Sequence, residues 1–525
     1  MAFRNEATHF RATAEGREDA FHAAYEAALK KARGELGRTY PLLIEGREVV
    51  TGRTFDDVDP SDTREVVGRF AAGGAAEVDA AVQAARKAQP AWGATPWQER
   101  ATIFDRAADL TSARKYDFAA WMTLENGKNR VEGIYDVDEA IDFLRFYASQ
   151  LREHDGYIVR MGEPFPGEEC TSVLRPWGVF GVLGPFNFPL AIPTGMTAGA
   201  LITGNAAVLK PASDTPLVAW QMVRLLHEAG VPKGVLHYVA GSGRDVGQTI
   251  LDHPDVDGVV FTGSRTVGMK GFASFVGRRP RPYIAEMGGK NAIVVTEKAD
   301  LAKAVPGVAR SAFGFGGQKC SACSRVYVHR SLRDRFVKDL VDRTRALKVL
   351  DPGKREADLG PVIRGDAVKT FLDAVEEAKR DGGKVLAGGR ALKDGALAHG
   401  HFVEPTIVDG LPRGHRLFRE ELFVPFLVVS DFSDLDEVID EVNAADYGLT
   451  SGIFSEDPAE VDRYFDRVHA GVVYANRARG GSTGAMVGGQ SFGGWKFSGT
   501  TDRGAGGPWY LLQFLREQSR TIARR

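Results

Sequence analysis

Apolar residues in the N-terminal part of the chain recur every three or four positions, which is the spacing of amphipathic helices. We therefore expect helices over residues 17–37, 75–89, 99–126 and 137–151. A different pattern occurs at 42–50, where two short apolar segments flank Glu45-Gly46. This pattern is typical of two strands joined by a hairpin turn.

From about residue 179 the chain changes to short, continuous apolar segments that alternate with helical ones. Strands are expected at 179–183, 206–209, 235–239, 258–261 and 292–295, with helices at 190–202, 216–229, 244–251 and 266–276. This alternation predicts a mostly parallel sheet with right-handed crossovers. In such a sheet, ligands bind at the carboxyl ends of the strands.

A second α/β unit is expected to begin after Asp300. Its predicted helices are 301–312 and 332–347, and its predicted strands are 326–328, 384–389, 426–429 and 471–474. A Gly-rich tail over 480–507 then leads to a last apolar segment at 510–515. No internal repeat or long low-complexity linker separates the two units, so we expect them to pack together.

One stretch, residues 176–209, contains no charged side chain and is long enough to span a bilayer. Pro185, Pro189 and Pro193 interrupt it, which favours a buried strand–loop–helix unit over a membrane helix. The N-terminus carries charges and shows no apolar leader. No membrane association is expected.

Composition narrows the class of protein further. The 525 residues suffice for about two to four domains. Lys plus Arg is 67 and Asp plus Glu is 69, so the net charge is -2, which predicts no nucleic-acid or membrane-surface partner. Only 3 Cys are present, which argues against a disulfide framework and favours a reducing compartment. We therefore expect a cytoplasmic location.

The segment from Gly316 to Arg325 holds the strongest candidate for chemistry, because it contains Cys320 and Cys323. A Cys that follows a Gly-rich turn and precedes an apolar strand can present a nucleophilic thiolate to a cleft. On this segment alone, half of a zinc site, a redox pair and a buried structural Cys stay open as alternatives. The third cysteine, Cys170, is far away in sequence and there is no second C-x-x-C, so no metal site is expected.

Three further segments carry polar groups next to predicted strands. Asn187 follows the first buried strand, where its amide could stabilise an oxyanion or simply form a turn. The turn containing Gly263, Ser264 and Gly268 could offer backbone N–H groups to a phosphate, or be an ordinary strand-to-helix turn. Glu286 precedes a Gly pair and could be a general base or a surface side chain.

Taken together, these segments resemble the aldehyde dehydrogenase superfamily from about residue 40 to the C-terminus. The matching motifs follow the family's order at 184–189, 209–211, 261–268, 286–290, 318–320, 421–423 and 492–494. The resemblance implies an α/β fold with a Rossmann-type cofactor domain, an α/β catalytic domain and a small oligomerisation hairpin. The implied boundaries are 1–145 and 166–292 for the dinucleotide-binding domain, 293–475 for the catalytic domain, and 146–165 and 476–525 for the oligomerisation and bridging segments.

The resemblance also assigns roles position by position. Cys320 is the implied nucleophile, Asn187 with the backbone N–H of Cys320 the oxyanion hole, and Glu286 the base that activates water. The implied reaction is NAD(P)-dependent oxidation of an aldehyde through a thiohemiacetal and a thioester on the cysteine. The implied cofactor-binding residues are Lys210, Ser213, Gly263, Ser264, Gly268, Glu421 and Phe423.

Two positions depart from the family pattern. Val424 stands where the motif Glu-x-Phe-Gly-Pro has Gly, so a changed backbone is expected at that turn. Ser213 stands where NAD-preferring relatives often carry Glu, and without that carboxylate a 2′-phosphate is not repelled. NAD is the expected cofactor, with NADP as the alternative.

Within the superfamily the chain is most similar to members that oxidise L-glutamate γ-semialdehyde, formed from 1-pyrroline-5-carboxylate, to glutamate in proline degradation. Phe3-Arg4-Asn5-Glu6 and the segments 138–143, 317–325, 483–488, 490–494 and 506–508 carry this similarity. The implied substrate-binding residues are Glu139, Phe188, Ser321, Gly484, Ala485 and Phe492. The alternatives are another semialdehyde, such as α-ketoglutarate or succinate semialdehyde, and a non-catalytic binding protein. The resemblance implies a homo-oligomer, with 156–161 and 510–515 pairing across subunits.

Overall fold

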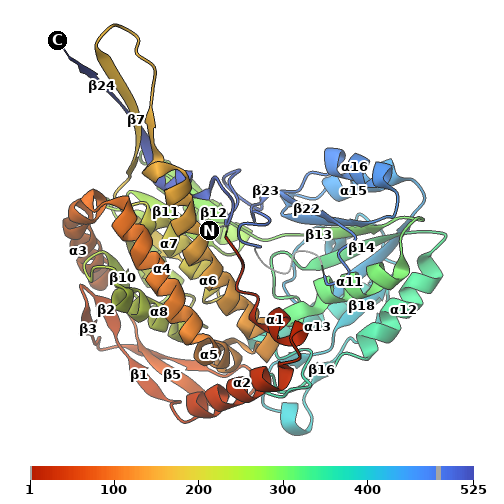
Figure 1. The fold of residues 1–525 in the computed structure, drawn as a ribbon. Helices are drawn as coiled ribbons and strands as arrows, with labels where there is room; N and C mark the ends of the chain where they lie inside the picture. The colour runs from red at the N-terminus through yellow and green to blue at the C-terminus, as the bar shows by residue number, and fades with distance from the viewer. Residues whose placement is uncertain (1–2, 481–485, 525) are drawn as a thin grey trace.

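The computed structural model of the protein describes residues 3–480 and 486–524. The chain forms two lobes that lie side by side, and a long hairpin projects from the first of them (Figure 1). Within the described residues, each lobe is built on a seven-stranded sheet covered by helices. Both sheets are mixed, with parallel strands at their centres.

The sheet of the first lobe has the strand order β12-β11-β8-β9-β10-β2-β3. Its strands are β2 Leu42–Ile44, β3 Arg47–Val49, β8 Val179–Leu183, β9 Ala206–Lys210, β10 Leu236–Tyr238, β11 Gly258–Thr262 and β12 Tyr283–Glu286. The strands predicted from 179 to 261 and the hairpin at Glu45-Gly46 are confirmed. β12 escaped prediction because it is short and follows an Arg- and Pro-rich stretch. The strand order reverses at β8, so the carboxyl ends of β8 and β11 flank the expected ligand crevice.

The helices of this lobe pack against this sheet or, like the first two, against other helices. They are α1 Thr8–Ala14, α2 Glu18–Arg33, α3 Ala75–Ala94, α4 Trp97–Ala113, α5 Lys115–Asn126, α6 Arg130–Glu153, α7 Ala191–Ile202, α8 Pro216–Ala229, α9 Gln248–Asp252 and α10 Arg265–Val276, with a π-helical turn at Gly243–Gly247. The single helix expected over 99–126 is two helices, because Arg114 leaves the helical conformation (φ −112°) between α4 and α5. The apolar periodicity continues across this break, so the sequence could not locate it. A small sheet, β1 Arg38–Tyr40, β5 Val66–Ala71 and β4 Thr54–Val58, completes the lobe.

The sheet of the second lobe has the order β15-β18-β19-β14-β13-β21-β22. Its strands are β13 Asn291–Val295, β14 Cys323–His329, β15 Lys384–Ala387, β18 Thr406–Asp409, β19 Phe426–Phe432, β21 Thr450–Phe454 and β22 Val472–Ala475. Its helices are α11 Leu301–Phe313, α12 Arg333–Arg345, α13 Gly365–Arg380, α14 Arg416–Arg419, α15 Leu435–Asn443 and α16 Pro458–Arg467. Two short ribbons pair β16 Ala391–Leu392 with β17 Phe402–Val403, and β20 Tyr447–Gly448 with β23 Trp495–Lys496. The expected domain boundary after residue 292 falls inside β13, all of which belongs to this second sheet.

The projecting hairpin is a three-stranded sheet of β6 Ile158–Arg160, β7 Glu168–Pro176 and the C-terminal β24 Leu515–Ala523. The expected boundary at residue 165 falls within it. One expectation needs correction: Tyr510–Phe514 forms a short 3-10 helix whose Tyr510 and Phe514 are buried in the chain's own core. That segment is therefore unavailable to a second subunit, and the exposed C-terminal strand is β24 instead.

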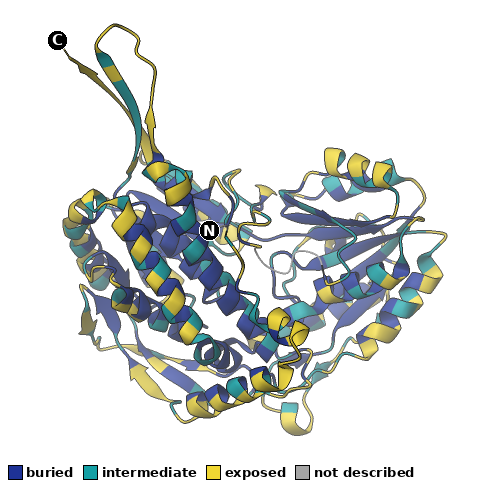
Figure 2. Cartoon of the chain, viewed as in Figure 1, coloured by how far each residue is buried: buried dark blue, intermediate teal, exposed yellow. Residues whose placement is uncertain are grey.

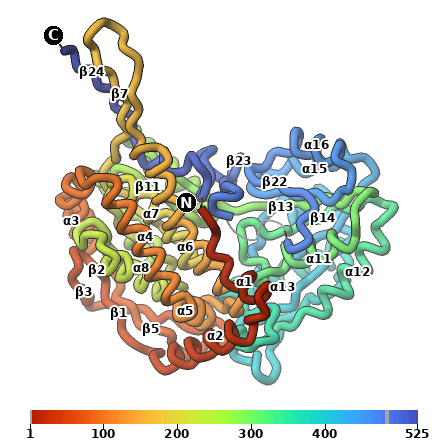
Figure 3. The backbone as a smooth tube through the Cα atoms, in the orientation of Figure 1, coloured from red at the N-terminus to blue at the C-terminus, as the bar shows by residue number. Residues whose placement is uncertain are grey.

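Burial is densest in the two sheets and in α6, which Figure 2 shows as dark blue for most of its length. α6 lies on the side of the first lobe that faces the second lobe (Figure 1). The tube in Figure 3 shows the N-terminal segment running down beside this helix. Within residues 3–480 and 486–524, no helix combines the length and the apolar character needed to cross a bilayer.

Candidate active site

Cys320 lies in the turn between a 3-10 turn, Gly314–Gly317, and β14, at the junction of the two lobes. Asn291, the first residue of β13, holds this turn in place. Its side-chain amide donates to the carbonyls of Cys320 (2.7 Å) and Ala322 (2.9 Å), and its oxygen accepts from the Thr450 N–H (3.0 Å). The sequence reasoning missed Asn291, because its only signal is its place after a Gly-Gly-Lys motif.

The second cysteine of the C-x-x-C segment has different surroundings. Cys323 is buried in the apolar core of the second lobe and donates its S–H to the Arg325 carbonyl (3.4 Å). Cys170 lies on the hairpin, and all three thiols are free. Cys320 lines cavities of about 500 and 60 Å³, whereas Cys323 borders a smaller one of about 20 Å³.

Asn187 follows β8 and is almost fully buried, with 3% of its surface exposed. Its amide donates to the carbonyl of Gln318 (3.1 Å), two residues before the nucleophile. The amide therefore lies close to the turn that carries Cys320. Its remaining N–H is a candidate donor to an oxygen atom bound there.

A buried ion pair supports the turn that carries Asn187. Lys128 Nζ lies 2.5 Å from Asp136 and 3.8 Å from the centre of the Phe188 ring. Asp136 also accepts from the N–H of Ala191 (2.6 Å). Both charged side chains are completely inaccessible to solvent, so each depends on the other for compensation. The motif search missed this pair, whose two members lie eight residues apart at the start of α6.

Cys320 lines two cavities. The first, of about 500 Å³, lies between the lobes, and its walls include Pro185, Gly263, Ser264, Glu421 and Phe423. The second, of about 60 Å³, is mostly apolar. It is lined by Glu139, Phe143, Phe188, Ile192, Gly195, Met196, Val260, Phe261, Thr262, Ile284, Glu286, Ser321, Phe492, Ala505 and Tyr510. The thiol is thus accessible from two directions.

Two carboxylates flank the thiol. Glu286 ends β12 and accepts from the Gly494 N–H (3.0 Å), and burial raises its pKa well above 4.5. Glu421 accepts from the Gly289 N–H (2.9 Å), and burial raises its pKa to about 7 although that N–H and Lys290 oppose the rise. Burial, together with these two carboxylates, raises the pKa of the Cys320 thiol. These surroundings oppose loss of the thiol proton, so a nearby base would assist the reaction.

The first cavity has the chemistry that a dinucleotide requires. Ser264 caps the N-terminus of α10, where backbone N–H groups and the helix dipole favour a phosphate. On the opposite wall the Glu421 carboxylate can accept from ribose hydroxyls. Gly288 lets that carboxylate reach the cavity, because a Cβ at this position would lie 2.0 Å from Glu421 Oε2. The residues present therefore fit such a cofactor.

Three of the predicted cofactor residues, Gly268, Lys210 and Ser213, are not among the residues that line this cavity. Gly268 lies in the first turn of α10. Lys210 ends β9, where its Nζ donates to the Pro211 carbonyl (2.7 Å) and burial lowers its pKa to about 8. Ser213 is exposed and donates to the Gly241 carbonyl (3.2 Å).

The structure explains how Val424 replaces the Gly of the family motif at this turn. The left-handed conformation falls on the preceding residue, Phe423, with φ of +60°. Val424 itself is buried in the apolar core of the second lobe. A β-branched residue is therefore accommodated without a left-handed backbone at its own position.

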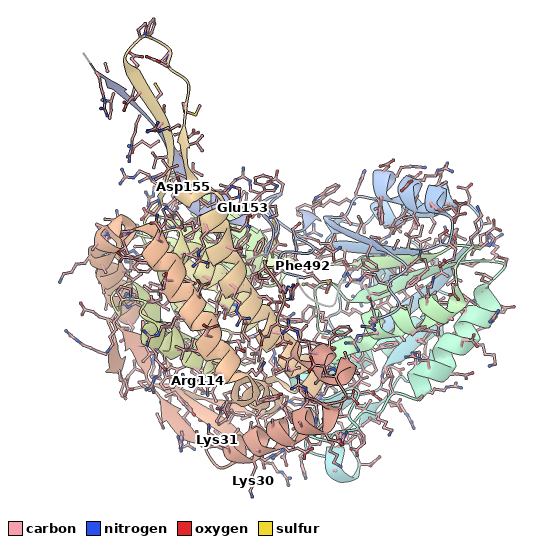
Figure 4. All side chains as sticks on the ribbon, viewed as in Figure 1. Lys30, Lys31, Arg114, Glu153, Asp155 and Phe492 are labelled. Atoms are coloured by element: carbon pink, nitrogen blue, oxygen red, sulfur yellow. The ribbon has the colours of Figure 1, made fainter. Side chains whose placement is uncertain are left out.

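The predicted substrate residues come together in the second cavity. Glu139 reaches it from α6, Phe188 from the turn after β8, Ser321 from the nucleophile turn, and Phe492 from the C-terminal segment. Figure 4 shows Phe492 between the two lobes. The remaining two, Gly484 and Ala485, lie outside the described residues.

A partly accessible thiol between a dinucleotide-type cavity and a small apolar cavity defines a cysteine-dependent dehydrogenase. The aldehyde dehydrogenase family model matches residues 48–519, and the chain belongs to this family. It is 40% identical to the 1-pyrroline-5-carboxylate dehydrogenase of Geobacillus kaustophilus, over 96% of both chains.

Two solved structures are similar over essentially the whole chain. The 1-pyrroline-5-carboxylate dehydrogenase from Thermus with bound NAD superposes with a TM-score of 0.93 at 37% identity, covering 100% of this chain and 99% of that one. Proline utilization A from Bdellovibrio bacteriovorus also superposes with a TM-score of 0.93, at 36% identity, covering 99% of this chain. The present chain spans 53% of that longer chain.

Proposed function

We propose that this protein oxidises L-glutamate γ-semialdehyde, the open form of 1-pyrroline-5-carboxylate, to L-glutamate in proline degradation, with NAD as hydride acceptor. The observation that carries this proposal is the position of Cys320, which faces a dinucleotide-type cavity on one side and a small, mostly apolar cavity on the other. The similarity to relatives named 1-pyrroline-5-carboxylate dehydrogenase, over 96% of the chain, supports the choice of substrate.

The first step is addition of the thiol to the aldehyde. Glu286 takes the proton of Cys320 as the sulfur bonds to the carbonyl carbon, and the carbonyl oxygen becomes an alkoxide. Burial raises the pKa of both groups, so the carboxylate is a stronger base in the same environment that makes the thiol a weaker acid. The Asn187 amide and the Cys320 N–H donate to the alkoxide and stabilise its charge.

When bound, the nicotinamide supplies the acceptor for the hydride that leaves the tetrahedral carbon, so that a thioester remains on Cys320. Glu421, Ser264 and Lys210 would hold this cofactor in the first cavity. Glu286 releases the proton of the thiol to solvent and then takes a proton from a water molecule whose oxygen attacks the thioester carbonyl. The sulfur of Cys320 is the leaving group, and the product is a carboxylate.

The second cavity suits a short aliphatic chain with a polar end. Phe188 and Phe492 contribute aromatic faces for the methylene groups, while Glu139 and Ser321 contribute polar atoms. On the basis of the resemblance alone, the backbone N–H groups of Gly484 and Ala485 would bind the α-carboxylate.

The choice between NAD and NADP rests on Ser213. Without a carboxylate at this position, NADP is expected to bind measurably, although NAD is preferred. Ser213→Glu should restore repulsion of a 2′-phosphate. Fluorescence titration is therefore expected to show weaker binding of NADP and little change for NAD. Equal losses for the two cofactors would contradict this assignment.

We also infer a homo-oligomer and a cytoplasmic location. The projecting hairpin exposes large apolar side chains, among them Ile158, Val159, Met161 and Phe165. Exposed apolar surface of this kind is typical of a protein–protein interface. Three free cysteines suit a reducing compartment.

A substrate panel on the purified protein tests the proposal. NADH production from 1-pyrroline-5-carboxylate should exceed that from propanal, succinate semialdehyde and α-ketoglutarate semialdehyde, and it should vanish in Cys320→Ala. Cys170→Ala, which removes a cysteine on the hairpin, is the matched control and should retain full activity. A preference for another aldehyde would overturn the substrate, and an active Cys320→Ala variant would overturn the mechanism.

A further inference from the structure

The N-terminal segment makes an unusual set of contacts for a chain terminus. We call residues 3–8 the N-terminal strap. It runs along α6, next to the junction of the two lobes, before the chain enters α1 (Figures 1 and 3). Its residues include the Phe3-Arg4-Asn5-Glu6 motif, for which the catalytic mechanism provides no role.

One side of the strap is bonded to two buried carboxylates of α6. Thr8 donates to Asp138 through its N–H (2.6 Å) and its hydroxyl (2.7 Å). Asn5 and the Glu6 N–H each donate to Asp142 at 2.8 Å. Asp138 and Asp142 are four residues apart, so they lie on one face of the helix.

These carboxylates depend on the strap. Each is only 5% exposed, and burial raises the pKa of Asp138 to about 7 and that of Asp142 to about 6. A buried carboxylate without hydrogen-bond donors is strongly unfavourable. The hydrogen bonds to Asp138 and Asp142 therefore hold the strap against α6. The Glu6 side chain adds ion pairs to Lys115 (2.9 Å) and Arg145 (2.6 Å).

The other side of the strap contacts the segment 486–488. The Asn5 amide donates to the carbonyl of Val487 (2.9 Å), a residue 482 positions away in sequence. The Phe3 ring packs over Gly488 and meets Phe146 of α6 edge to face, with 5.2 Å between ring centres. The strap therefore joins α6 to a segment near the C-terminus.

Both elements that the strap joins form walls of the substrate cavity. On α6, Glu139 and Phe143 each follow a strap-bound carboxylate by one residue and line the cavity. On the other side, Val487 packs against Gly506, whose carbonyl accepts from the Gly488 N–H (2.9 Å).

The next residue toward the cavity completes this connection. Ala505, adjacent to Gly506, exchanges two backbone hydrogen bonds with Phe492 (2.9 and 2.7 Å). Both Ala505 and Phe492 line the substrate cavity. A continuous chain of contacts thus links Asn5 to the wall that faces Cys320.

We infer that the N-terminal strap is a positioning segment that sets the selectivity of the substrate cavity by fixing the distance between α6 and the Phe492–Ala505 wall. This inference rests on the proposed function. A small aldehyde needs Cys320 and Asn187 but not the far wall. A five-carbon amino-acid semialdehyde must contact both walls at once, so it depends on their separation.

Asn5→Ala tests this inference in the full-length protein. The loss of the bond to Val487 should lower kcat/KM for L-glutamate γ-semialdehyde by about tenfold, mainly through KM, while the value for propanal changes by less than about twofold. Asn5→Asp should be worse, because a carboxylate cannot donate to Val487 and repels Asp142. Phe3→Ala offers a second perturbation of the same contact if the Asn5 variants do not fold.

Thr8→Ala is the matched control. It removes the hydrogen bond from the Thr8 hydroxyl to Asp138 of α6 and the bond from Lys115 to that hydroxyl, and no hydrogen bond among the described residues joins Thr8 to segment 486–488. It should destabilise the protein to a similar degree in urea unfolding without changing the ratio of the two kcat/KM values. Equal losses on both substrates in the Asn5 variants, or the same ratio change in Thr8→Ala, would overturn the inference. A wild-type protein inactive on 1-pyrroline-5-carboxylate would instead overturn the proposed function.

Discussion

Asn291→Ala should separate the geometry of the nucleophile from the stability of the fold. The substitution leaves the carbonyls of Cys320 and Ala322 without their donor and the Thr450 N–H without its acceptor. An unsatisfied buried polar group costs about 1–3 kcal/mol, so three groups at the lower limit cost about 3 kcal/mol. The freed turn should also move the thiol, and a shift of about 1 Å costs about 100-fold in rate.

Two assays together test this prediction. Urea unfolding should show the loss of stability, and kcat for aldehyde oxidation should fall. The rate of Cys320 alkylation by iodoacetamide should instead rise, because a loosened turn exposes further a thiol that is now only partly accessible. Activity and alkylation are both measured at urea concentrations well below the midpoint of unfolding. Under these conditions, lower activity together with faster alkylation indicates displacement of the thiol and not general unfolding.

Asn205→Ala provides a matched control. This Asn is also buried and makes three hydrogen bonds, with the Gly178 N–H, the Thr203 hydroxyl and the Phe514 carbonyl, each 2.9 Å long. It precedes β9, at the end of the strand opposite Lys210. Its loss should cost about the same stability, about 3 kcal/mol, and leave alkylation unchanged. If both variants leave Cys320 equally reactive, Asn291 has no role in positioning the nucleophile.

Further predictions concern three other residues. Glu286→Gln should slow both the addition of the thiol to the aldehyde and the hydrolysis of the thioester; in the wild type the hydrolysis rate should rise with pH around a midpoint above 4.5, and a flat profile would contradict the role of base. Burial alone would raise the pKa of Glu6, but Lys115 and Arg145 outweigh it and lower this pKa to about 2. The stabilising effect of the Glu6 carboxylate is therefore complete above pH 4.5 and is lost as the pH falls toward 2. In urea titrations, Glu6→Gln should be less stable than the wild type at neutral pH and should lose much of this dependence on acid. Gly288→Ala should weaken cofactor binding in fluorescence titrations, whereas Gly52→Ala, with no neighbour within 4 Å of its new methyl group, should not.

The local pattern of apolar and polar residues predicted many of the strands and helices of the fold. Uninterrupted apolar segments such as Val179–Leu183 identified the buried parallel strands, because a strand covered on both faces needs no polar residue. Short or weakly apolar elements such as β12, β18 and β21 were missed. The break at Arg114 was missed as well, because the periodicity of an amphipathic helix reports a face and not a change of axis.

For the active site too, some features could be predicted from the sequence and others only from the structure. The candidate residues Cys320, Asn187 and Glu286 could be selected from the sequence, since each belongs to a motif whose order identifies the family. The left-handed backbone that allows Val424 lies at Phe423 and could not be read from the motif.

The sequence by itself determined the class of fold, the family and the residues that carry the chemistry. Only the tertiary structure decided what supports those residues: the bonds of Asn291 to the nucleophile turn, and the link from Asn5 to Val487 across 482 positions. The physical reason is that motifs and periodicity record interactions between neighbours in the chain. A hydrogen bond between distant residues exists only after packing has brought donor and acceptor together, and it leaves no periodic trace in either segment.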